Sequence, residues 1–257
     1  MTTTAPPRVR AVVPLVLAGL LVLAAIAYPL TDGGARDAVT WSIVLLGSAV
    51  SVTHAGLSRG WRTGAGVLVT VVVASLVFES IGLATGYPYG SYTYGDVLGP
   101  RLLDVPLLVP LAWLLMAWPS RVLAERLAGR PATRVLVGTY LFAAWDVVLD
   151  PQLVQAGYWT WAHPSPGLPG IDTVPLTNLA GWVLAGLVLM TLLEVLVVRT
   201  ATPPRIGAAA PLVGLGWMTL GGALAHVGWL DLPGSAAWGA LLAVPVLVAL
   251  AVRRRGR

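Results

Sequence analysis

The stretch Trp145-Asp146-Val147-Val148-Leu149-Asp150-Pro151 places two acids four residues apart in an apolar run. An aromatic loop, Gly157-Tyr158-Trp159-Thr160-Trp161, follows, and Pro175-Leu176-Thr177-Asn178 then begins another apolar run that contains Trp182. Residues four apart share one face of a helix. Because ionisable groups are costly in lipid, acids on such a helix are candidates for a functional role.

The composition around this stretch is that of an integral membrane protein. Of 257 residues, 57% are hydrophobic and only 11% are charged, whereas about a quarter of a soluble domain is charged. Cysteine is absent and every basic residue is arginine. Disulfides, thiolate metal sites and lysine Schiff-base chemistry are therefore excluded. We expect residues 1–257 to form a single integral membrane domain.

Apolar segments predict an all-α, polytopic membrane protein with about eight transmembrane helices. The predicted spans are about 11–30, 38–57, 64–84, 104–120, 133–150, 176–198, 208–228 and 236–252. With a cytoplasmic N-terminus, only Arg36 and Arg101 of the sixteen arginines lie outside. This bias indicates that both termini are cytoplasmic, in a multi-pass protein of the cell membrane. It also explains the net charge of +5 without a nucleic-acid partner.

Four predicted helices bring a polar group to a similar depth near the outer surface. Glu79 lies in the span 64–84, Asp146 lies one turn below Asp150, Asp104 opens the fourth span, and Asn178 lies just inside the sixth. This convergence predicts a functional site. Hydrogen bonding between helices is the alternative, since polar residues in membranes also serve that purpose.

Aromatic side chains accompany these polar groups. They are Tyr87, Tyr89, Tyr92 and Tyr94 in one outer loop, Trp159 and Trp161 in the other, and Trp113 and Trp145 in helices. One interpretation is an aromatic belt at the membrane surface. The other is a wall that stacks on an unsaturated ligand or shields a carbocation. Both loops are rich in Gly and Pro and could fold back over a cavity.

The chain also contains an internal echo. Val105-Pro106-Leu107 before Trp113 resembles Val174-Pro175-Leu176 before Trp182. Each of these helical hairpins carries an acid in its first helix, Glu79 or Asp146. Chance similarity in a chain rich in Val, Pro and Leu is one explanation. An internal repeat, with an axis along the membrane normal between the two hairpins, is the other.

The remaining polar groups suggest no metal or cofactor site. The histidines are dispersed, and Glu194, close to Arg199, is expected either to form a local ion pair or to snorkel toward the membrane surface. Asp146 and Asp150 resemble half of the paired aspartate motif by which membrane prenyltransferases hold magnesium and diphosphate. A second motif and more basic residues would be needed, and Arg101 is the only arginine nearby.

Two blocks of sequence carry a family resemblance. The first includes Phe78-Glu79, the tyrosine-rich loop 86–94, Val105-Pro106 and Trp113, and the second includes Asp146, Asp150-Pro151, Trp159, Trp161, Pro175-Leu176-Thr177-Asn178 and Trp182. Together they resemble the membrane carotenoid hydratases, which include bisanhydrobacterioruberin hydratases and γ-carotene or lycopene hydratases. The resemblance covers residues 75–185. It departs from the family at 167–172, which read Gly-Leu-Pro-Gly-Ile-Asp where a Gly-Tyr-Tyr-Gly-like run is expected.

The resemblance implies a hydro-lyase that adds water to the terminal double bond of an acyclic carotenoid and gives a tertiary alcohol. A buried carboxyl group would donate the proton and a second carboxylate would hold the water. Asp146 is favoured as the donor because it is deeper than Asp150, with Glu79 as the other candidate. Asp150, Asp104 and Asn178 would place the water, and no cofactor or metal is needed.

The implied partners are a lycopene-, γ-carotene- or bisanhydrobacterioruberin-like carotenoid, water, the lipid bilayer and other carotenoid biosynthesis enzymes. Two alternatives remain open. One is a non-enzymatic carotenoid- or lipid-binding protein or transporter, which would tolerate neutralisation of Glu79 and Asp146. The other is a membrane prenyltransferase or cyclase, which would depend on magnesium and diphosphate.

Overall fold

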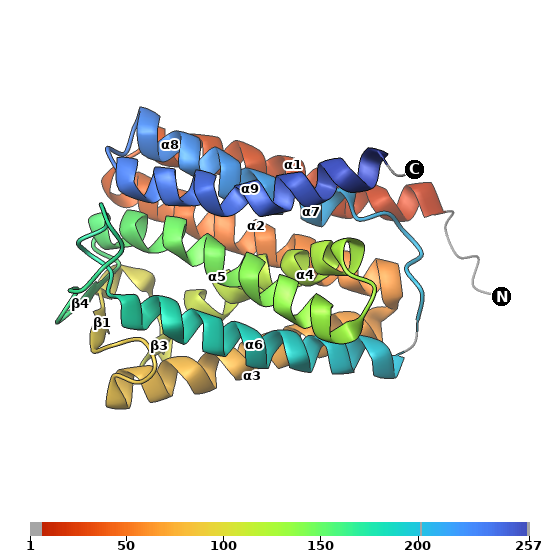
Figure 1. Cartoon of the computed structure of the whole chain (residues 1–257), viewed down its shortest axis with the longest axis horizontal. Helices are drawn as coiled ribbons and strands as arrows, with labels where there is room; N and C mark the ends of the chain where they lie inside the picture. Colours follow the sequence, from red (N-terminus) through yellow and green to blue (C-terminus); the bar gives the residue numbers. More distant parts are fainter. Residues whose placement is uncertain (1–6, 201, 256–257) are drawn as a thin grey trace.

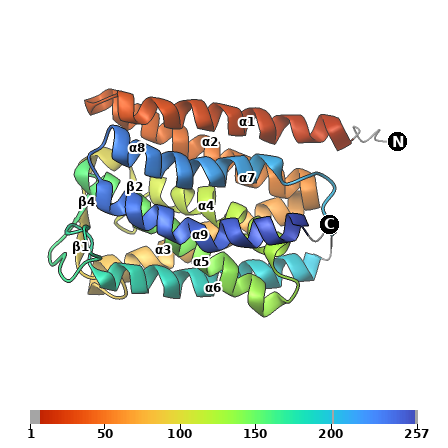
Figure 2. The same cartoon turned by 45° about the horizontal axis from the view of Figure 1, so that its top comes forward.

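The long helices of the protein lie side by side in one bundle (Figures 1 and 2). The computed structural model describes residues 7–200 and 202–255. The helices are α1 (Pro7–Ala27), α2 (Gly33–Arg59), α3 (Trp61–Thr85), α4 (Leu108–Leu127), α5 (Pro131–Gln155), α6 (Leu176–Thr200), α7 (Ala209–Gly216), α8 (Gly222–Gly228) and α9 (Pro233–Arg255). Short 3-10 turns cover Tyr28–Leu30 (η1) and Asp96–Leu98 (η2), and a π-helical segment covers Trp217–Gly221 (η3).

Seven helical segments in the described part of the chain are long and apolar enough to cross a membrane. They are Ala11–Leu30, Gly33–Arg59, Trp61–Thr85, Pro131–Gln155, Leu176–Thr200, Ala209–Gly228 and Pro233–Arg253. Helices satisfy their own backbone hydrogen bonds and are therefore suited to lipid. The prediction of an all-α, polytopic membrane protein is confirmed.

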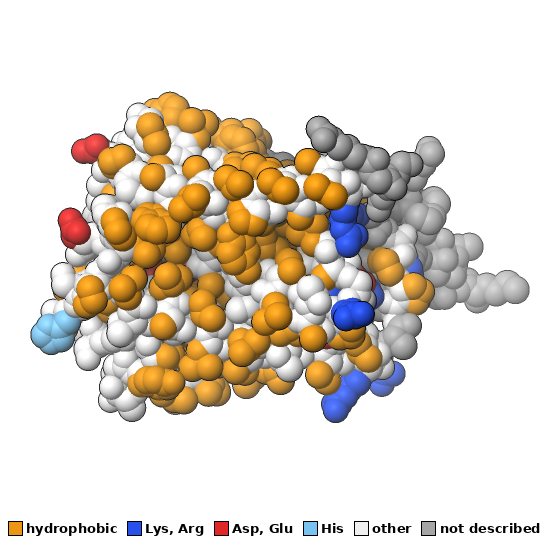
Figure 3. All heavy atoms as spheres, viewed as in Figure 1, with side chains coloured by type: hydrophobic (Ala, Val, Ile, Leu, Met, Phe, Trp, Pro, Cys, Tyr) orange, Lys and Arg blue, Asp and Glu red, His pale blue; other side chains and the backbone are white. Residues whose placement is uncertain are grey.

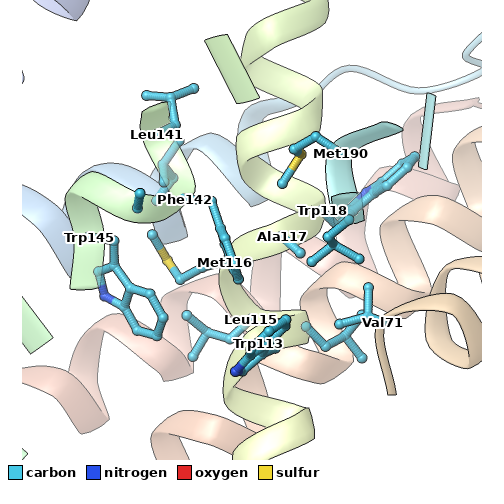
Figure 4. Packing of buried hydrophobic residues seen from close by; sticks show 14 of the residues in the cluster. Val71, Trp113, Leu115, Met116, Ala117, Trp118, Leu141, Phe142, Trp145 and Met190 are labelled. Atoms are coloured by element: carbon cyan, nitrogen blue, oxygen red, sulfur yellow. The ribbon is translucent and has the colours of Figure 1, made fainter. Parts of the chain in front are cut away.

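Besides these seven segments, the described part of the chain has one more long helix, α4, which lies inside the bundle. It carries Arg121, Glu125 and Arg126 and is not among the seven apolar segments. It packs against α2, α3, α5 and α7, and most of its residues are buried. Trp113 and Trp118 on α4 meet Phe142 of α5 and Met190 of α6 in the core (Figure 4).

The predicted start of the fourth helix was wrong. The fourth helix begins at Leu108 and not at 104, because residues 101–106 form a hairpin of β2 (Arg101–Leu102) and β3 (Val105–Pro106). Its two turn residues, Leu103 and Asp104, have positive φ angles of 53° and 64°, as a tight hairpin turn requires. The predicted seventh span, 208–228, agrees with the continuous segment Ala209–Gly228, and the π segment η3 within it was not predicted.

The two ends of the bundle differ in character. At one end, the loop end, lie the connections 86–107 and 156–175, and at the other, the arginine end, lie Arg59, Arg121, Arg134 and Arg253. Arginines gather at one end of the face in Figure 3, and acids and a histidine at the other. Helix α1 begins and α9 finishes at the arginine end (Figure 1). The assignment of that end to the cytoplasm stays a prediction.

The two long connections pair with each other at the loop end. Strand β1 (Tyr92–Tyr94) runs antiparallel to β4 (Trp159–Trp161), with Thr93 opposite Thr160. Glu79 and Asp146 precede these threonines by the same number of residues. The rings of Trp113 and Trp182, the echoed tryptophans, lie with centroids 5.1 Å apart. A twofold axis between the hairpins α3–α4 and α5–α6 would produce this arrangement.

Candidate active site

The carboxylate of Glu79 lies on α3 and accepts three hydrogen bonds from the aromatic residues around it. The Tyr92 hydroxyl donates to Oε2 at 2.5 Å and the Tyr94 hydroxyl to the same oxygen at 2.8 Å. The indole of Trp113 donates to Oε1 at 3.1 Å. Only 4% of Glu79 is exposed, so these bonds replace the water that a carboxylate would otherwise hold.

The two tyrosines remain donors over a wide pH range. Burial, followed by the nearby Glu79 carboxyl, raises the pKa of the Tyr92 and Tyr94 phenols above the usual value. Both phenols are therefore protonated wherever the protein functions, and each can keep a hydrogen on its bond to Glu79.

A second acidic group is formed by Asp146 and Asp150 on α5, both almost fully buried. The side-chain amide of Asn178 on α6 donates to Asp146 Oδ2 at 2.9 Å and also, closely, to Asp150 Oδ2. Among the described residues, Asp146 Oδ1 has no hydrogen-bond partner. Two carboxyl groups thus share one amide, whereas Glu79 has three donors to itself. Placing two negative charges here without further donors would be costly.

A narrow cavity of about 60 Å³ lies between these acidic groups. Glu79, Asp150 and Asn178 line it, but Asp146 does not. Asp146 faces a smaller void of about 20 Å³ beneath the loop 168–176. The rest of the cavity wall is mainly aromatic and aliphatic, and in the described part of the chain no arginine lines it. An apolar, unsaturated group would fit such a site.

Strands β1 and β4 form the aromatic roof of the cavity. Tyr92, Tyr94, Trp159 and Trp161 all line it. The ring of Tyr92 lies 6.0 Å from that of Trp161, and Tyr94 lies 5.8 Å from Trp159. These four rings therefore lie against the cavity, and their part in binding a ligand stays a prediction.

Two glycines allow the roof to approach the helices. A Cβ atom on Gly181 of α6 would lie 2.5 Å from Cδ1 of Tyr89, and one on Gly82 of α3 would lie 2.9 Å from the Tyr92 hydroxyl. The indole of Trp161 donates to the backbone oxygen of Tyr89 at 3.1 Å. Tyr89 is thereby held between α3 and α6, and it also lines the cavity.

The structure brings most of the predicted site residues together, with two exceptions. Asp104 is exposed in the β2–β3 turn, and 65% of Tyr87 is exposed. Neither residue lines the cavity. Asp104 was expected to begin a helix, but the hairpin turns its side chain away from the bundle. Trp113 and Trp145 line the cavity as predicted.

Among the residues that line the cavity, three polar or aromatic ones, Thr40, Tyr158 and Trp182, were not predicted as site residues. Trp182 packs against Trp113 and Phe142, with ring centroids 5.1 and 5.0 Å away. Tyr158 and Thr40 hydrogen-bond each other at 3.0 Å, and Tyr158 also donates to Asp37 at 2.7 Å. Trp182 and Tyr158 occur within the quoted motifs, which was a usable signal. Thr40 on α2 has no comparable signal in the sequence.

Polar groups elsewhere are used in packing. Glu194 pairs with Arg121 at 2.7 Å and with Arg134 at 3.0 Å, so the expected pairing with Arg199 was wrong. These partners come from other helices, which sequence distance did not reveal. His226 hydrogen-bonds Ser235 and Gln152 and does not line the site cavity. No group of three potential metal ligands occurs among the described residues.

Fold and site together define a multi-pass membrane protein with a buried, acidic and aromatic site. The chain belongs to the family of carotenoid biosynthesis proteins, whose family model matches residues 15–249. It is also 36% identical over 132 residues to the bisanhydrobacterioruberin hydratase of Haloarcula japonica. That alignment covers 49% of this chain and 43% of the relative, so the chain spans under half of the relative's length. No solved structure matches the chain.

Proposed function

We propose that this protein is a hydratase of the cell membrane that adds water to the terminal double bond of an acyclic carotenoid end group. The observation that carries this proposal is the position of Glu79 and Asp150, which face one apolar, aromatic cavity from different helices. The family and the hydratase relative support the carotenoid as substrate class.

The two acidic groups suit the two proton transfers of the reaction. The Asp146–Asp150 pair shares one amide donor, so retaining one proton between the two carboxyls relieves their repulsion. Asp150 faces the cavity and would give that proton to the less substituted alkene carbon. This assignment refines the sequence-based preference for Asp146, which lies behind Asp150 and shares the proton.

The second transfer completes the reaction. Protonation leaves a tertiary carbocation, and the oxygen of a water molecule forms a bond to it. The water then loses one proton, for which Glu79 is the acceptor, and the product is a tertiary alcohol. The three donors to Glu79 hold the carboxylate in place, and the indole and phenol rings around the cavity stabilise the cation. The Asp pair regains its proton from Glu79 through water.

Expression in a lycopene-producing host tests this proposal. Wild-type protein should give pigments whose mass increases by one water per reacted end. Asp150→Asn should abolish this product, because an amide cannot donate an acidic proton, while the protein still inserts and retains carotenoid. Asp172→Asn serves as the control, because Asp172 is an exposed loop carboxyl outside the cavity.

Three results would contradict the proposal. Full hydration by Asp150→Asn would exclude Asp150 as the proton donor. A mass gain of one oxygen alone would indicate an oxygenase. Carotenoid retention without any mass change in the wild type would indicate a binding protein.

A further inference from the structure

Two larger cavities lie beside α5, outside the candidate active site. One, the middle cavity, has a volume of about 330 Å³ and lies between α1, α2, α5 and α8. The other, the arginine-end cavity, has a volume of about 720 Å³ and lies between α4, α5, α7 and α9. On the face shown in Figure 3, the surface is hollowed between α9 and α5.

The three cavities follow one another along α5. Trp145 and Leu149 line both the site cavity and the middle cavity. Val148 lines both the middle and the arginine-end cavities. From Gln152 to Tyr140, the two larger cavities extend along α5 for ~18 Å at ~1.5 Å per residue. The three cavities therefore lie in a row along α5 toward the arginine end, with Trp145, Leu149 and Val148 at the places where neighbouring cavities meet.

The π segment η3 lies where the two larger cavities meet. Trp217 and Met218 line the middle cavity, whereas Thr219 and Leu220 line the arginine-end cavity. Single π turns within α-helices occur frequently at functional sites. Here the extra residue in the turn changes which side chains of the α7–α8 helix face α5.

The lining of the two larger cavities suits a long apolar chain. Only the far end of the arginine-end cavity is more polar. The middle cavity is lined almost entirely by aliphatic and aromatic residues. The arginine-end cavity adds Glu125, Arg126 and Arg253 at its far end. Arg253 donates to the backbone oxygens of Arg126 and Leu127 at 2.6 and 3.0 Å, so it ties α9 to α4 and closes that end of the space.

We infer that these two cavities hold the polyene of the substrate while its reacting end occupies the site cavity. This inference rests on the proposed function, and it gives a binding place to the part of the substrate that the site cavity does not hold. The site cavity, at about 60 Å³, has room for an end group but not for a whole carotenoid. The cavity-lining residues of α5, α7, η3 and α9 then limit the length of the polyene that can bind.

Gly216 provides a direct test. It lines the arginine-end cavity, and a Cβ atom there would meet nothing within 4 Å. Gly216→Leu should therefore obstruct the cavity without disturbing the fold. Gly19→Leu is the matched control, because Gly19 is an exposed glycine on α1 with the same open space and lines none of these cavities.

The assay uses purified protein with two substrates that share an acyclic end group, lycopene and a short isoprenoid alkene that fits the site cavity alone. Gly216→Leu should lower hydration of lycopene at least tenfold and leave hydration of the short alkene within twofold of the wild type. It should also lose the lycopene that copurifies with the wild type. Gly19→Leu should match the wild type in every measurement.

The outcomes separate this inference from the proposed function. An unchanged ratio between the two substrates, with wild-type hydration intact, would overturn the polyene assignment alone. Phospholipid that copurifies in equal amounts with wild type and Gly216→Leu, with lycopene retained by both, would also overturn it. If the wild type hydrates neither substrate, the proposed function fails. The amounts of lycopene that copurify with Gly216→Leu and Gly19→Leu then still test whether the larger cavities bind the polyene.

Discussion

At the scale of single residues, the main feature is the unequal treatment of three buried acids. Glu79 has three dedicated donors, whereas Asp146 and Asp150 share one amide. The sequence indicated that Glu79, Asp146 and Asp150 would converge, because their depth can be counted along each helix, but it wrongly added Asp104. It could not show how the donors are divided between them, because Tyr92 and Tyr94 reach Glu79 only after the loop has folded back.

The donors to Glu79 lead to a prediction for Tyr92. Tyr92→Phe removes one hydroxyl from a buried carboxylate, which costs roughly 1.5–3 kcal/mol for a hydrogen bond to a charged group. The corresponding fall in turnover is about ten- to a hundredfold. Tyr87→Phe should have no effect, because Tyr87 is exposed and lies outside the cavity. Equal turnover by Tyr92→Phe and the wild type, measured as lycopene hydration, would argue against Glu79 as the proton acceptor.

The scale of elements shows where prediction from sequence succeeded and where it stopped. Hydropathy located the apolar helices because each must be long and apolar enough to span lipid. It missed the β1–β4 and β2–β3 pairs, because strands of two or three residues leave no periodicity to read. The same β2–β3 hairpin placed Asp104 outside the site, so the wrong start of the fourth helix also produced the misplaced acid.

The contact between α6 and the roof leads to a second prediction. Gly181→Ala places a Cβ atom 2.5 Å from Tyr89, which forces the ring or the roof to move. Such overpacking typically costs roughly 1–3 kcal/mol. A lowered thermal unfolding midpoint in detergent and reduced hydration should both result. Gly19→Ala, made where a Cβ atom meets nothing within 4 Å, should leave both measurements unchanged, and the same outcome for Gly181→Ala would exclude the tight contact.

At the scale of the whole molecule, charge is separated along the bundle. The acids and aromatic groups of the site lie toward the loop end, and a network of ion pairs lies at the arginine end. Arg121, only 1% exposed, pairs with Glu194 and Glu125, and Arg59 pairs with Glu125 at 2.6 Å. The arginine bias can be read from the sequence, and so can the i,i+4 spacing of Arg121 and Glu125 on α4. The pairs of Arg121 with Glu194 and of Arg59 with Glu125 join different helices, so no local pattern reveals them.

The network leads to a third prediction. Glu194→Gln leaves the buried Arg121 without its nearest counter-charge, and the loss of one partner from a buried ion pair costs about 3–5 kcal/mol. The thermal unfolding midpoint should fall clearly, while hydration per folded molecule stays at the wild-type level. Asp96→Asn, which removes an exposed partner of Arg101, should change neither. A drop in hydration per folded molecule for Glu194→Gln would indicate that the arginine end contributes to the reaction.

The pairing of β1 with β4 imposes an order on biosynthesis. Strand β1 leaves the ribosome early, but its partner follows only after α4 and α5 have been made. During that interval Glu79 is already in the membrane under an unfinished roof. A nascent chain that stops before Trp161 has Glu79 but lacks part of the cavity wall, so the cavity is complete only after the second hairpin has been made.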